Sequence, residues 1–115
     1  MNNIFEIAFD LQSKLKESPE YIKLKQCENI INNDHISKSL VDNYKKLHED
    51  YTFDHSTQLQ VKLHEAKLEM DQNINVINYK KAYKEYMLLV GNITDIVFEN
   101  YKNDNVLDKI IRACK

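Results

Sequence analysis

Apolar residues recur at helical spacing along this chain, and polar turns divide the pattern into five segments. This period of about 3.6 residues predicts amphipathic α-helices rather than strands, so the expected fold class is all-α. The five expected helices cover about residues 3–17, 19 to the turn at 32–34, 35–51, 59 to the turn at 71–73, and 74 or 75 to 101. Residues 103–115 are expected to be a short tail, with room for a last short helix around 106–111.

Each of the first four expected helices carries one apolar stripe, which predicts the face that it buries. In the second helix the stripe includes Cys27, which should therefore point at the core. The stripes are Ile4, Ile7, Ala8, Leu11 and Leu15; Tyr21, Leu24, Cys27, Ile30 and Ile31; Ile36, Leu40, Tyr44, Leu47 and Tyr51; and Leu59, Leu63, Ala66 and Met70.

The single proline of the chain indicates where the second helix begins. Ser18 can cap the amide groups that open a helix, and Pro19 needs no hydrogen-bond donor at the first helical position. The pair therefore ends one helix and starts another.

The fifth expected helix is unusually long and is apolar on more than one side around "YMLLVGNITDIVF". Such a helix needs neighbours on several sides, so we expect a dimer formed largely through it. Gly91 in its interior costs about 1 kcal/mol relative to alanine, which indicates either close packing or a bend. The expected interface residues are Tyr83, Met87, Val90, Ile93 and Val97.

The composition supports one small helical domain spanning residues 1–115. Charged residues make up 30% of the chain, with only one glycine and one proline, which suits long helices with few tight turns. The net charge is −2, and the basic and acidic residues are spread along the chain. No basic tail is therefore present to attract nucleic acid, and nucleic-acid binding is not expected. The amino terminus lacks the basic segment of a signal peptide, and no apolar run approaches the roughly 18 residues of a membrane span, so we expect a cytoplasmic protein with reduced cysteines.

The order of these parts resembles the YlbF/YmcA/YheA family of small helical bacterial proteins. In that family a first helix with an A-x-x-L stripe leads to an S-P-E-Y break, then to a helix that ends in an acidic turn, then to a long helix. The weaker resemblance of "NINVINYKKAYKEYMLLVGNITDIVFE" to the family's long last helix extends it to residues 4–100. The matching positions are Ala8, Leu11, Leu15, Ser18, Glu20, Tyr21, Asp34 and Leu40.

The resemblance implies a non-enzymatic regulator that acts through protein–protein interactions. Family members form helical dimers or larger assemblies, and the best-known two join a third protein in a complex that redirects the ribonuclease RNase Y, affecting mRNA maturation, competence and biofilm formation. The partners implied are a second copy, sister family members and a ribonuclease complex. YheA-like members, with no comparable role assigned, match equally well in length.

The same resemblance raises an alternative, because that complex is reported to carry iron–sulfur clusters. Cys114 would be the candidate ligand, in a redox-sensing subunit that shares a cluster with partner proteins. A single cysteine cannot hold a four-cysteine cluster, so the expected state is an unliganded thiol and no cofactor.

A third alternative is a small RNA-binding bundle. The segment "YKKAYKEY" combines lysines with tyrosines, as single-strand-binding surfaces do. Lysine stems beside buried tyrosines explain the same residues, and this explanation is preferred. No pairing of a nucleophile with a base stands out, so catalytic residues are not expected.

Overall fold

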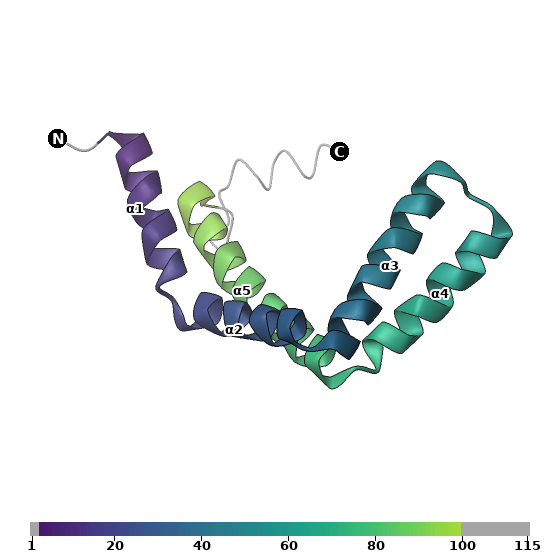
Figure 1. The fold of residues 1–115 in the computed structure, drawn as a ribbon. Coiled ribbons are helices and arrows are strands. Elements are labelled where there is room, and N and C mark those ends of the chain that lie inside the picture. The colour runs from purple at the N-terminus through teal and green to yellow at the C-terminus, as the bar shows by residue number, and fades with distance from the viewer. Residues whose placement is uncertain (1–2, 100–115) are drawn as a thin grey trace, which may run out of the picture.

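The computed structural model describes residues 3–99, which form five α-helices and no strand (Figure 1). The helices are α1 (Ile4–Lys16), α2 (Pro19–Asn33), α3 (His35–Phe53), α4 (Thr57–Asp71) and α5 (Ile74–Phe98). The expected all-α fold with a long last helix is confirmed. Helix α5 has 25 residues and ends where Glu99 adopts a left-handed conformation (φ 57°), earlier than expected. The expected end at Tyr101 and the expected tail lie outside the described residues.

Capping side chains fix where each helix begins, because each one accepts a hydrogen bond from an amide of the first helical turn. The Ser18 hydroxyl accepts from the amide of Tyr21 at 3.2 Å, and Pro19 occupies the start of α2, as the sequence predicts. The five capping residues are Asn3, Ser18, Asp34, Ser56 and Asn73. Only a few residues connect successive helices, and each capping residue acts on the helix that follows it. The local sequence therefore determines where each helix begins.

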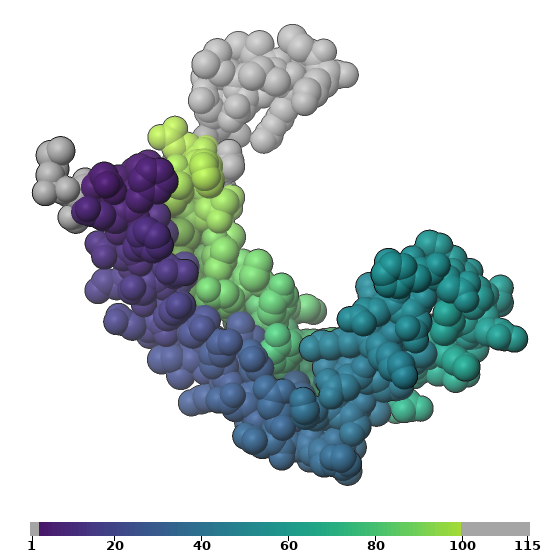
Figure 2. Space-filling view, turned by 45° about the horizontal axis from the view of Figure 1, so that its top comes forward, coloured from purple at the N-terminus to yellow at the C-terminus, as the bar shows by residue number. Residues whose placement is uncertain are grey.

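The five helices form an open V rather than a compact bundle (Figures 1 and 2). Helices α3 and α4 pair as a hairpin that makes one arm, and α2 packs on the first half of α5 at the base. Helix α1 and the far half of α5 make the other arm. The radius of gyration is 19.8 Å, whereas a compact domain of this size has about 13 Å. The single chain therefore leaves much of its apolar surface uncovered.

Two small apolar clusters hold the base together. In the first, Leu24 and Cys27 of α2 pack on Ala82 of α5; in the second, Ile31 packs with residues of α4 and α5. Cys27 is buried, so its expected place in the core is confirmed. The second cluster contains Ile31, Met70 and Val76, with Leu40, Val41, Tyr44 and Tyr79 packed against it.

The prediction of one buried stripe per helix is wrong for α1. No residue of α1 is buried, and Ile4 and Ile7 are 76% and 56% exposed. The reason is that α1 makes only a few contacts with α2, so its apolar face is left largely uncovered by the described residues. Ile30 and Ile36, which lie on either side of the turn between α2 and α3, are also exposed.

Gly91 has open space beside it. A β-carbon at this position would meet no atom within 4 Å, so close packing within the described chain does not explain the glycine. None of the helices described here has the length and apolar content needed to cross a bilayer.

Candidate protein-interaction surface

The far half of α5 extends beyond the helix that covers its first half. The rings of Tyr21, near the start of α2, and Tyr86 lie 5.6 Å apart, and α2 begins only two residues before Tyr21. From Met87 to Phe98, α5 therefore extends about 18 Å further, with α1 on the same arm (Figure 2). This projecting part of α5 carries several exposed apolar side chains beyond the region that α2 covers.

The predicted interface residues lie on α5, from just before Tyr86 to near the end of the helix. Tyr83, Met87 and Val97 are 47%, 43% and 58% exposed, while Val90 and Ile93 are half-buried. The five side chains are thus accessible to a second molecule. That a second copy covers them stays a prediction.

Sequence reasoning missed further apolar residues on the same arm. Phe5 and Phe9, one helical turn apart on α1, are 71% and 68% exposed. Their i, i+4 spacing was the available signal, but they fall outside the stripe that the helical period selected. Exposed apolar residues of α5 that were also missed are Leu88, Ile96 and Phe98.

A polar junction, also missed, joins the start of α3 to the start of α5. Ser37 is fully buried, and its hydroxyl lies 3.0 Å from Oδ1 of Asn73 and within hydrogen-bonding distance of the Asp34 carboxylate. The Asn75 amide donates to Oγ of Ser37 at 3.1 Å and to Oδ2 of Asp34 at 3.3 Å. These contacts hold the α3–α4 hairpin to the base.

The junction also sets the charge state of its carboxylate. Hydrogen bonds from the side chain and the backbone of Ser37, and from Asn75, lower the pKa of Asp34 below its usual range. The ionised carboxylate lies at the amino-terminal end of α3, where the helix dipole favours negative charge. Within the described residues, every buried side-chain nitrogen or oxygen has a hydrogen-bond partner.

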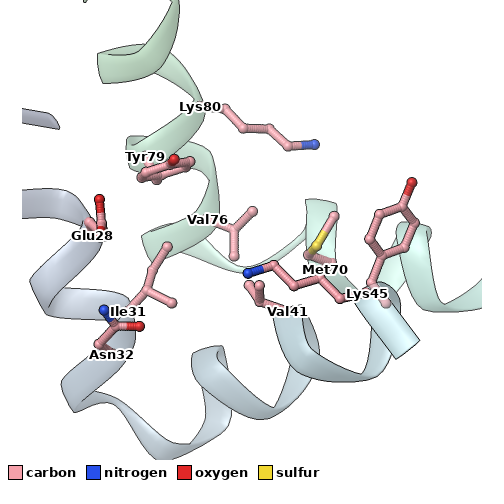
Figure 3. Close-up of a pocket in the computed structure, with 10 residues that line it drawn as sticks. Glu28, Ile31, Asn32, Val41, Lys45, Met70, Val76, Tyr79 and Lys80 are labelled. Carbon is pink, nitrogen blue, oxygen red and sulfur yellow. The ribbon is translucent and has the colours of Figure 1, made fainter. Parts of the chain in front are cut away.

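A groove opens where α2 and the start of α5 meet the α3–α4 hairpin (Figure 3). Its volume is about 570 Å³, within the range of ligand pockets in proteins. The floor is apolar, and side chains of α2, α3 and α5 form the rim. The lining includes Glu28, Ile31, Asn32, Val41, Tyr44, Lys45, Met70, Val76, Tyr79 and Lys80.

Ion pairing and burial shape one side of this groove. Lys80 forms an ion pair with Asp71, and this hydrogen bond is the main cause of the lowered pKa of the Asp71 carboxyl. Lys67 pairs with the same carboxylate at 3.7 Å. Partial burial raises the pKa of Tyr79, so its hydroxyl stays neutral and can donate a hydrogen bond.

Between residues 3 and 99 the structure brings together no group of three or more His, Cys, Asp or Glu side chains able to hold a metal ion. The candidate ligand Cys114 lies outside the described residues, so the predictions about a cluster stay predictions. The arrangement of the described residues offers surfaces and a groove for binding.

Comparison with known protein families identifies the family of this chain. The chain matches the family model described as "Control of competence regulator ComK, YlbF/YmcA" over residues 4–100. The match has the extent expected from the first helices together with the long last helix, so the resemblance seen in the sequence is confirmed. No curated protein and no solved structure shows significant similarity to the chain. The chain belongs to the YlbF/YmcA family of regulatory proteins.

Proposed function

We propose that this protein is a non-enzymatic cytoplasmic adaptor that pairs with a second copy through α5 and regulates other proteins by binding them. The observation that carries the proposal is the projecting part of α5, where Met87 and Val97 remain accessible and no helix among residues 3–99 covers them as α2 covers the first half. Exposed apolar patches of this kind mark interaction sites in soluble proteins.

The open shape of the chain supports the same proposal. Few side chains of the described chain are fully buried, so little apolar surface is removed from water to offset the conformational entropy lost on folding. Pairing two projecting arms would cover the α1 and α5 side chains together. The assembly would then have a stability that depends on protein concentration.

The family description connects the proposal to a process. That description names control of the competence regulator ComK, and the resemblance to the family implies action on ribonuclease-dependent mRNA processing. We therefore place the adaptor in a regulatory assembly with sister family members and a ribonuclease.

Light scattering at micromolar concentration tests the pairing. The intact protein should have the mass of a dimer, and Val90→Asp should shift it to a monomer that keeps its helical circular dichroism. Lys46→Asp, on the α3–α4 arm, is the matched control and should remain a dimer. A wild-type protein that is monomeric at all concentrations would overturn the pairing.

Affinity purification from the native cell tests the regulatory partners. A tagged protein isolated under anaerobic conditions should recover sister family members and a ribonuclease in stoichiometric amounts. The same eluate tests the cluster alternative, because iron and a visible charge-transfer band that disappear in Cys114→Ser would assign that residue a ligand role.

A further inference from the structure

The groove between the base and the α3–α4 hairpin is separate from most of the α5 face assigned to the second copy. Val41 and Met70 form part of its floor, and Lys45 and Lys80 extend over it from α3 and α5 (Figure 3). Tyr83 is the one residue shared with the predicted dimer face, since it lines a hollow that continues this groove. A segment bound in the groove would therefore leave most of the α5 face free for the second copy.

The charges at the rim favour an acidic occupant. Among residues 3–99, Lys45 forms no ion pair, and Lys80 shares the Asp71 carboxylate with Lys67. Glu28, the only carboxylate in the lining, is paired with Lys25 at 3.3 Å. An incoming carboxylate would thus meet an unpaired ammonium group above an apolar floor.

The shape favours a chain-like occupant over a compact one. Tyr79 and Lys80 line both the groove and a second hollow of about 300 Å³, which also contains Tyr83 and Lys84. The rings of Tyr79 and Tyr83 are stacked with centroids 6.3 Å apart, so the same tyrosine–lysine pattern repeats after one turn of α5. Lys84, like Lys45, has no ion-pair partner in the described part of the chain.

We propose that this groove binds an acidic amphipathic segment of a partner protein. One apolar side chain of the segment enters the floor beside Val41 and Met70, and its carboxylates pair with Lys45 and Lys84. This proposal rests on the proposed function only in requiring a protein partner, and it does not require the dimer. A nucleic-acid strand fits less well, because the floor beside Val41 and Met70 is aliphatic.

A displayed library of random 16-residue peptides tests this chemistry on the full-length protein. Selected peptides should combine Asp or Glu with Leu, Phe or Met. A fluorescein-labelled copy of the most enriched peptide should lose affinity about tenfold or more in Lys45→Glu. Lys46→Glu is the matched control, because Lys46 is adjacent, exposed and absent from the lining, and it should bind as the wild type does.

Several results would overturn the proposal. They are the absence of enriched peptides, enrichment of neutral or basic peptides, equal losses in both lysine variants, and Lys45-dependent binding of labelled oligouridine that is tighter than that of the peptide. Circular dichroism and urea midpoints should match between the two variants, so that a lost affinity reports the groove and not the fold. Val90→Asp separates the two proposals, since it should abolish the dimer and leave peptide affinity unchanged.

Discussion

The hydroxyl of Ser37 lies 3.0 Å from the side-chain oxygen of Asn73, although 36 positions separate the two residues in sequence. A hydroxyl has one proton, so Ser37 can donate to either Asn73 or Asp34 at any moment, while it accepts from Asn75. Asn73 Oδ1 also accepts from the amides of Asn75 and Val76. The junction therefore links the caps of two helices through one buried side chain.

Ser37→Ala should destabilise the fold by about 1–3 kcal/mol, because it removes a fully buried hydroxyl and leaves Asp34, Asn73 and Asn75 with one hydrogen-bond partner fewer. Urea unfolding followed by circular dichroism measures the change. Ser39→Ala is the matched control, since Ser39 lies on the same helix and is exposed, and it should change the midpoint little. Equal midpoints for both variants would show that solvent replaces the Ser37 contacts.

The lowered pKa of Asp34 predicts a specific loss of stability in acid. Because the folded pKa is below the unfolded one, the unfolded chain binds more protons as the pH falls through the ordinary aspartate value of 3.8. The stabilisation from ionised Asp34 is thus present above that pH and is lost as the pH falls to the folded pKa. Asp34→Asn, which keeps a capping side chain, should flatten the curve of unfolding free energy against pH below about pH 4.

Two further variants check the cause of this dependence. Hydrogen bonds from Ser37 are the largest contribution to the lowered pKa of Asp34, and the one from Asn75 is smaller. Ser37→Ala should therefore reduce the acid-dependent loss more than Asn75→Ala does. Curves for all variants that run parallel to the wild type would contradict an ionised, hydrogen-bonded Asp34.

Local signals in the sequence were sufficient for the helices and the family, and insufficient for the contacts between helices. Ser18, Pro19 and Asp34 act on their own neighbours, so caps and periodicity located the helices within a few residues. The Ser37–Asn73 contact depends on how two turns meet in space, and no spacing in the sequence encodes that. The same limit applies to α1. Its apolar stripe indicates that the helix has a face to bury, but the stripe does not indicate whether another helix of the described chain covers that face.

Ala82→Leu should destabilise the base of the V by about 1–3 kcal/mol, because Ala82 is fully buried between Leu24 and Cys27 and has no room for a larger side chain. Ala8→Leu is the matched control on exposed α1 and should be tolerated. Thermal unfolding of both variants measures the difference. Similar melting temperatures would indicate that α2 can shift on α5 without cost.

Gly91→Ala should raise the stability of the single chain by about 1 kcal/mol. Alanine favours the helical conformation, and the added carbon meets no atom within 4 Å in this chain. Urea unfolding of the monomeric Val90→Asp protein, with and without the Gly91 substitution, measures this effect free of association. In the wild-type background, a fall in dimer affinity on the same substitution would show that a second copy approaches α5 closely at Gly91. If the monomer itself loses stability, the space beside Gly91 must be occupied within the chain, which would contradict the open arm described here.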